Sequence, residues 1–96
     1  AVAALKRVVA KEPNWAAAQN ELGYAYIKLN QPKDAVAVLK KAVAADATMS
    51  LAWYNLGEAQ YRARDNDYKK TLERLKKLDP GMGERLQRET AGIVLK

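Results

Sequence analysis

The chain has 96 residues, of which 49% are apolar, and its 17 Lys and Arg against 11 Asp and Glu give a formal net charge of +6. The absence of Cys and His excludes disulfides, thiol and imidazole catalysis, and nearly all zinc and haem sites. No apolar run approaches the roughly 18 residues of a membrane span. We therefore expect one soluble domain, in the cytoplasm or the periplasm, without metal or cofactor.

The sequence repeats itself with a period of 34 residues. Residues 1–10, AVAALKRVVA, match residues 35–44, AVAVLKKAVA, at seven of ten positions. The same offset places the Leu-Gly pair at 22–23 on the Leu-Gly pair at 56–57. This period is that of a helix–turn–helix repeat, so we expect an all-α fold in which helix pairs stack on one another.

In chain order, the repeat divides the sequence into four segments. Residues 1–13 are expected to be the second helix of a repeat whose first helix is missing, and residues 14–47 and 48–80 to be two full repeats. Residues 81–96 are expected to be a capping helix. The chain thus contains about two and a half repeats and a C-terminal cap.

Local signals predict where the helices begin and end. Asn14 and Thr48 are good N-caps for first helices that run to about residues 29 and 62. Asn30 tolerates the left-handed conformation of a helix stop, and Pro32 suits the first turn of the next helix, which runs to about residue 45.

The last repeat can be placed in registers that differ by a few residues. Residues 65–67, Asp-Asn-Asp, predict a break and an N-cap for a helix that Pro80 and Gly81 close after residue 78. Counted from Tyr68, three positions fit the second-helix pattern, namely Thr71, Leu75 and Leu78. The capping helix is expected at residues 83–94, and its apolar residues Leu86, Ile93 and Leu95 are available to cover the preceding pair.

Residues of both repeats resemble the signature of the tetratricopeptide repeat. They are Leu22, Gly23, Tyr26, Ala35, Leu39, Ala42, Trp53, Leu56, Gly57 and Pro80. The sequence departs from this signature where Gln19 stands in place of the first Trp and Gln60 in place of the aromatic that Tyr26 supplies. Because Gly23 and Gly57 lack side chains, we expect each first helix to approach its partner closely at these positions.

The resemblance implies a right-handed superhelix whose concave face, lined by first helices, receives a peptide or a helix of another protein. Read onto this chain, the concave residues are Ala17, Asn20, Tyr24, Ile27, Lys28, Leu51, Tyr54, Asn55, Glu58, Tyr61 and Arg62. Tyr24, Tyr54 and Tyr61 are the preferred anchors, since Tyr is common at protein interfaces. The alternative is that they are ordinary half-buried packing residues.

Other partners fit the sequence less well. Lys70, Arg74 and Lys77 form a basic stripe that suits nucleic acid or a membrane surface, but interleaved acidic residues favour a solvated helix face. The Lys, Asn and Arg set that grips acidic chaperone tails in this family is incomplete, because a Lys position holds Glu84, although Asn55 matches and Arg88 is a candidate match. Homo-oligomerisation through the open N-terminal helix face is a further hypothesis.

No arrangement of residues indicates an enzyme. The Asp65–Asp67 turn lacks the later ligands of a calcium loop, and Gly81 and Gly83 are better explained by a turn than by a phosphate-binding loop. Ser50 is the only serine, and no His can activate it.

Overall fold

The computed structural model describes residues 2–92, and within this range it consists of six helices joined by short turns. They are α1 (Val2–Lys11), α2 (Ala16–Lys28), α3 (Pro32–Ala45), α4 (Ser50–Arg62), α5 (Tyr68–Leu78) and α6 (Pro80–Ala91). The all-α repeat expected from the sequence is confirmed.

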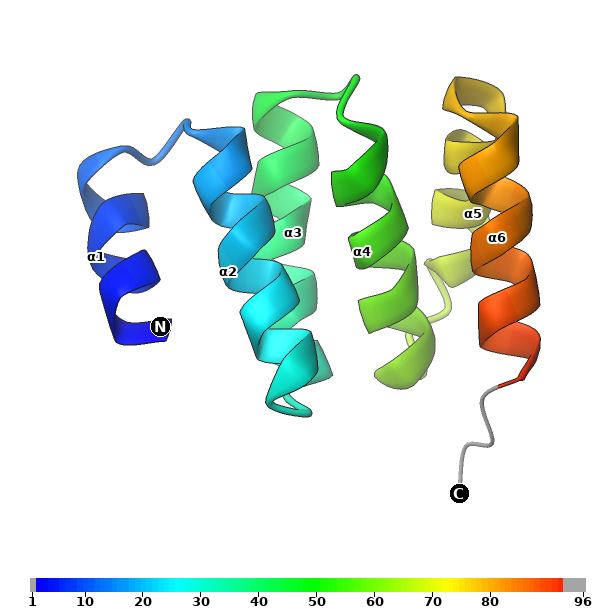
Figure 1. The fold of residues 1–96 in the computed structure, drawn as a ribbon, viewed down its shortest axis with the longest axis horizontal. Coiled ribbons are helices and arrows are strands. Elements are labelled where there is room, and N and C mark those ends of the chain that lie inside the picture. Colours follow the sequence, from blue (N-terminus) through cyan, green and yellow to red (C-terminus); the bar gives the residue numbers. More distant parts are fainter. Residues whose placement is uncertain (1, 93–96) are drawn as a thin grey trace.

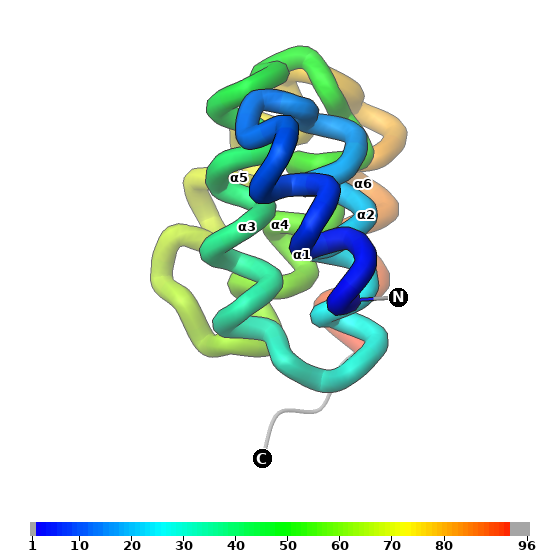
Figure 2. The backbone as a smooth tube through the Cα atoms, turned by 90° about the vertical axis from the view of Figure 1, so that its left-hand side faces the viewer, coloured from blue at the N-terminus to red at the C-terminus, as the bar shows by residue number. Residues whose placement is uncertain are grey.

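The helices form two layers (Figures 1 and 2). One layer contains α2, α4 and α6, which face the viewer in Figure 1, and the other contains α1, α3 and α5. Each helix packs on its neighbours in sequence, and α4 also contacts α2 and α6 within its own layer. The first helices of successive repeats therefore line one broad face of a body that measures 36 × 30 × 19 Å.

Small residues allow α2 and α3, the first complete helix pair, to pack closely. Ala35, Leu39 and Ala42 of α3 are fully buried. A Cβ atom added to Gly23 of α2 would lie 2.3 Å from the Cγ atom of Leu39, which is far below van der Waals contact. The close approach expected at Gly23 is therefore present, since only a residue without a side chain fits there.

Gly57 has a different neighbour. A Cβ atom there would lie 2.5 Å from Cδ2 of Leu86 in α6, whereas Thr71 of α5 would be at an ordinary 3.5 Å. At Gly57, α4 therefore comes closer to the capping helix α6 than to α5, the second helix of its own repeat. Leu86 is fully buried, as the sequence predicted for a residue that covers the preceding pair; residues 93 and 95 lie outside the described range.

The predicted N-caps are wrong by one residue. Trp15 and Met49 occupy the cap positions of α2 and α4 with extended backbones, and neither makes a side-chain cap hydrogen bond. Thr48 instead uses its hydroxyl and its backbone N–H to donate to Oδ1 of Asp46, at 2.7 and 3.0 Å. These two bonds hold Thr48 in the preceding turn and lower the pKa of Asp46.

The ends of α2 and α4 are built alike. Asn30 and Arg64, one period apart, have positive φ values of 58° and 57°. The residue after each donates its N–H to a carbonyl five residues earlier, Gln31 to Tyr26 and Asp65 to Gln60. These are the bonds of a left-handed helix stop, so the role predicted for Asn30 is confirmed, as is Pro32 in the first turn of α3.

The structure shows the register of the last repeat, and its capping helix begins earlier than the sequence predicted. The loop between α4 and α5 is two residues longer than that between α2 and α3, and Thr71 and Leu75 are buried as Ala35 and Leu39 are.

Pro80 does not close α5; it begins α6, where the Asp79 carboxylate accepts from the N–H of Met82 at 3.2 Å. A proline loses nothing in the first turn, because its missing N–H has no partner there.

Gly81 and Gly83 consequently lie within α6 and do not form a turn. A Cβ atom on Gly83 would lie 2.8 Å from Cα and 3.0 Å from N of Lys76 in α5. Gly83 therefore lets the backbones of α5 and α6 come into contact. A Cβ atom on Gly81 would meet nothing closer than 3.7 Å.

The outer helix α1 is less well covered than its equivalent α3. Its apolar residues Val2, Leu5 and Val9 pack on the core but stay half-buried, and no residue of α1 is fully buried. The reason is that α3 lies between α2 and α4, whereas α1 contacts α2 alone among the described helices.

Candidate binding groove

The first helices enclose a groove of about 600 Å³ on the face formed by α2, α4 and α6. Its lining residues are Tyr24, Ile27, Lys28, Asn30, Leu51, Tyr54, Asn55, Glu58, Arg62, Met82, Arg85 and Glu89. Eight of the eleven concave residues that the sequence proposed line this groove, and Ala17 lines neither it nor the side pocket beside it.

A side pocket of about 430 Å³ continues the groove toward α1. It shares Tyr24, Leu51 and Asn55 with the groove and adds Leu5, Asn20 and Glu21. Asn20, the ninth residue of the expected set, is therefore part of the same surface.

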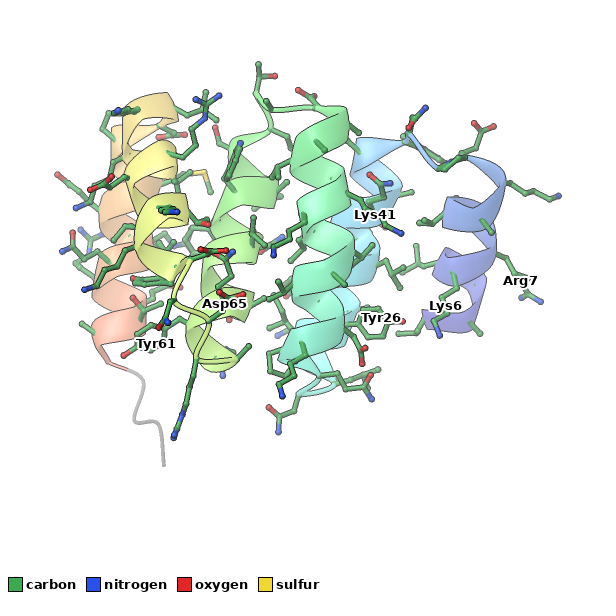
Figure 3. The ribbon with its side chains drawn as sticks, turned by 180° about the vertical axis from the view of Figure 1, so that it is seen from behind. Lys6, Arg7, Tyr26, Lys41, Tyr61 and Asp65 are labelled. Atoms are coloured by element: carbon green, nitrogen blue, oxygen red, sulfur yellow. The ribbon has the colours of Figure 1, made fainter. Side chains whose placement is uncertain are left out.

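Tyr61, the tenth residue, lies elsewhere. It packs against Tyr68 of α5, with ring centroids 5.0 Å apart and planes inclined at 59°. Figure 3, seen from behind, shows Tyr61 beside Asp65 at the turn between α4 and α5. Tyr61 therefore packs between α4 and α5, which is the alternative role that the sequence left open for the three tyrosines.

Tyr24 and Leu51 form the exposed apolar part of the groove. Tyr24 of α2 is 49% exposed and Leu51 of α4 is 51% exposed, and both line the groove and the side pocket. Large apolar side chains that remain half exposed on a concave surface are the usual anchors for a partner.

Tyr54 has a different role, because α6 covers it. Its side chain is buried, its hydroxyl donates to Oε2 of Glu89, and the Arg85 guanidinium lies 5.6 Å from the centre of its ring. Burial and the Glu89 carboxylate raise the pKa of Tyr54 well above its ordinary value. Tyr54 thus joins α4 to α6 at the floor of the groove.

Two hydrogen bonds connect successive first helices across the floor. Asn55 donates its Nδ2 to Oδ1 of Asn20 at 2.8 Å, and both residues are buried. Tyr54 and Glu89 make the corresponding bond one repeat later, and the partners are 35 residues apart in both pairs. Equivalent positions therefore connect α2 to α4 and α4 to α6.

Most charges in the groove are paired within one helix. Arg62 bonds Glu58 at 3.1 Å, and Arg85 bonds Glu89 at 2.8 Å. The Tyr54 hydroxyl and then Arg85 lower the pKa of Glu89. Lys28 lies 5.4 Å from the centre of the Tyr24 ring and, among the described residues, has no carboxylate partner.

Comparison with known families agrees with this geometry. A family model described as tetratricopeptide repeat matches residues 1–56, and a second with the same description matches residues 51–81. The chain belongs to the tetratricopeptide-repeat family. No curated protein matches the chain. Tetratricopeptide repeats are in general non-catalytic scaffolds that mediate protein interactions.

Helix α6 supplies groove residues that were not predicted from the sequence. Met82, Arg85 and Glu89 of α6 line the groove, whereas Glu84 and Arg88 do not. The period of 34 residues carries Leu51 to Arg85 and Asn55 to Glu89, so an unbroken period was the signal that could have found them. Glu84 and Arg88, which the sequence analysis compared with the chaperone-tail set, each lie one residue before a groove residue, Arg85 and Glu89.

Within residues 2–92 no group of acidic side chains is arranged to hold a metal ion. Likewise, none of the described helices is both long and apolar enough to cross a bilayer.

Proposed function

We propose that this tetratricopeptide domain binds a segment of another protein in the groove formed by α2, α4 and α6. The observation that carries the proposal is the pair Tyr24 and Leu51, which stay half exposed on facing helices of a concave surface. An apolar side chain of the partner would fill the space between them and remove both from water.

The charges of the groove indicate the chemistry of the partner beside this anchor. Among the described residues, Lys28 is the groove cation that no carboxylate bonds, so an acidic residue of the partner would be favoured next to it. Glu58 and Glu89 remain on the groove surface and oppose a run of several acidic residues. An acidic chaperone tail is therefore disfavoured. The reason is the negative charge of Glu58 and Glu89 in the groove, and not Glu84, which does not line it.

The test compares two doubly substituted proteins. Peptides are selected from a random dodecapeptide display library on the wild-type domain, and their affinities are measured for Tyr24→Ala/Leu51→Ala and for Trp15→Ala/Leu29→Ala. The control pair is matched, because Trp15 and Leu29 are 54% and 56% exposed and line neither the groove nor the side pocket.

We expect the groove pair to lose at least about tenfold in affinity, since burying one large apolar side chain contributes about 1.5–3 kcal/mol. The control pair should bind as the wild type does. Equal losses in the two variants, or no loss in either, would contradict peptide binding in the groove.

A second candidate function uses the opposite layer. A groove of about 470 Å³ between α3 and α5 is lined by Lys40, Lys70 and Arg74 and by one acidic residue, Asp67; among the described residues no carboxylate bonds these cations. The surface suits an anionic polymer or a membrane headgroup. Binding of this kind would weaken steeply with salt and would be lost in Lys70→Gln/Arg74→Gln, whereas peptide binding in the groove would change little.

A third candidate is self-association through α1, whose apolar side chains are only half buried while the equivalent residues of α3 are buried. Its measurement is the solution mass at high concentration. A monomer throughout would count against it.

A further inference from the structure

The charge of the chain is divided unequally between its two layers of helices. The outer layer, which consists of α1, α3 and α5, carries eleven Lys and Arg against two Asp and Glu, a net charge of +9. Helices α2, α4 and α6 carry four basic and four acidic residues, a net charge of zero. The outer layer therefore holds more positive charge than the net +6 of the whole chain.

The cations of the outer layer are exposed and lack acidic partners. Ten of the eleven are exposed, and among the described residues no carboxylate bonds any of them. The ion pairs of Arg62 and Arg85 both lie in the other layer. On an ordinary solvated helix, opposite charges alternate and pair at i,i+4. The outer layer departs from that pattern, since Glu73 is the single acidic residue within α5.

Two equivalent grooves in the outer layer have cations in their linings. One, of about 320 Å³, lies between α1 and α3 and is lined in part by Lys6 and Lys41 (Figure 3). The other is the groove between α3 and α5, where Lys40 lies 34 residues after Lys6, and α5 adds Lys70 and Arg74. Cations from all three helices thus face the same side of the molecule.

These grooves offer a partner little besides charge. Each is lined by one carboxylate, Asp34 in the first and Asp67 in the second, and by more cations than that. Leu22 and Leu56, in the two linings, are only 4% and 3% exposed. Among the described residues of the outer layer, the exposed large apolar side chain is Leu78, at the end of α5. An apolar partner would therefore remove little apolar surface from water, and attraction between charges has to supply the affinity.

Duplex DNA is the polyanion that matches these properties. It carries one negative charge per about 1.7 Å of its axis, and cations reach its phosphates without touching the bases. A single strand is usually gripped by aromatic rings that stack on its bases, and a membrane surface by apolar side chains that enter it. The described helices of the outer layer expose no aromatic ring, and Trp53 in the second groove is half-buried, with the Arg74 guanidinium 5.7 Å from the centre of its ring.

We infer that the outer layer binds the phosphate backbones of duplex DNA without reading the base sequence. This inference rests on the second candidate function and names its partner, and it is independent of peptide binding on the opposite layer. The cations that line the two grooves, among them Lys6, Lys41 and Lys70, bond the phosphates. Bound DNA also relieves the repulsion between like charges, so it raises the melting temperature of the domain.

The experiment measures how the affinity for DNA depends on salt. A fluorescent duplex of about 24 base pairs and random sequence is titrated with the protein at roughly 50–200 mM NaCl, and each phosphate contact contributes about 0.9 to the slope of log affinity against log salt. Lys70→Gln should lower this slope by about 0.9, and Lys6→Gln/Lys41→Gln/Lys70→Gln by about 2.7, with at least a tenfold loss of affinity. Arg88→Gln is the matched control, because it removes one exposed cation from α6 outside both layers' grooves, and it should keep the wild-type slope.

The substituted side chains are all exposed, so the variants should stay folded, which circular dichroism checks. Equal slopes in Lys70→Gln and Arg88→Gln would overturn the inference, because the charge of the whole chain would then act in place of the outer layer. If a single strand, or vesicles of phosphatidylserine and phosphatidylcholine, bind more tightly than the duplex and are lost in the triple variant, the inference is wrong and the second candidate function stands. If neither DNA nor vesicles bind at about 50 mM salt, both are rejected.

Discussion

Gly81 and Gly83 allow the close contact between α5 and α6 to be tested within a single helix. Both are helical, and they are two residues apart, but a Cβ atom on Gly83 would lie 2.8 Å from Cα of Lys76 while one on Gly81 would meet nothing within 3.7 Å. The same substitution, Gly→Ala, should therefore have opposite effects at the two positions.

The magnitudes follow from two opposing contributions. Ala is favoured over Gly inside a helix by about 1 kcal/mol, and Gly81→Ala should gain roughly 0.5–1 kcal/mol because α6 has barely begun there. Overpacking costs about 1–3 kcal/mol, and Gly83→Ala should be near the upper end, since the atoms that obstruct it include the α5 backbone. The net loss at Gly83 is then about 2 kcal/mol.

Thermal unfolding followed by helical circular dichroism measures both effects. In a domain of this length, about 1 kcal/mol shifts the melting temperature by roughly 4–8 °C, so Gly81→Ala should melt a few degrees higher and Gly83→Ala about 10 °C lower. Each protein is also unfolded in urea to check that the slope is unchanged. A Gly83→Ala protein that melts with or above the wild type would refute the close crossing of α5 and α6.

Two further predictions concern polar groups. The folded pKa of Glu89 is lowered, so the stability that it contributes is present above its ordinary value of 4.5 and is lost as the pH falls through the folded pKa. The urea midpoint of the wild type should therefore move toward that of Glu89→Gln as the pH falls below 4.5; a difference that does not shrink at any acid pH at which the domain stays folded would argue against the bond to Tyr54. Gln60→Leu removes a sealed, unpartnered oxygen and should raise the free energy of unfolding by about 1–2 kcal/mol, whereas Gln19→Leu should gain less because Gln19 also donates to the Pro13 carbonyl. Equal gains in the two variants would show that the bond to Pro13 contributes nothing.

The fold could be predicted because the residues that determine it recur with a fixed period. Small residues at 23, 35 and 42 and large ones at 22, 39 and 56 recur at the spacing that a stacked helix pair requires, and all are buried. Even an apparent departure preserves the period. Gln19 donates to the carbonyl of Pro13, as the Trp53 indole does to that of Ala47, and both bonds span six residues.

The starts of the helices could not be predicted in the same way, because they depend on competition between neighbouring polar groups. Thr48 is a good cap by residue type, but Asp46, two residues earlier, takes both of its donors. Pro80 was read as a stop, whereas Asp79 makes it the first residue of α6. In both cases a carboxylate at the turn decides which residue begins the helix.

The binding face was predictable in position but not in detail. Helical spacing places Tyr24, Tyr54 and Tyr61 near the concave side, yet each is used differently, because its exposure depends on helices distant in sequence. No later helix covers Tyr24, α6 covers Tyr54, and Tyr68 packs on Tyr61. The role of a tyrosine in this fold therefore depends on which helix packs over it. The sequence of the helix that contains the tyrosine does not predict this.

The two floor bonds show how equivalent positions of a periodic fold can differ in chemistry. Asn20–Asn55 and Tyr54–Glu89 occupy equivalent positions in successive repeats, with the same separation of 35 residues. At the second position the Glu89 carboxylate accepts from both Tyr54 and Arg85. At the first, the amides of Asn20 and Asn55, which both line the side pocket, share a single bond. Because the backbone geometry repeats while these side chains do not, successive repeats present different polar groups at the floor of the groove.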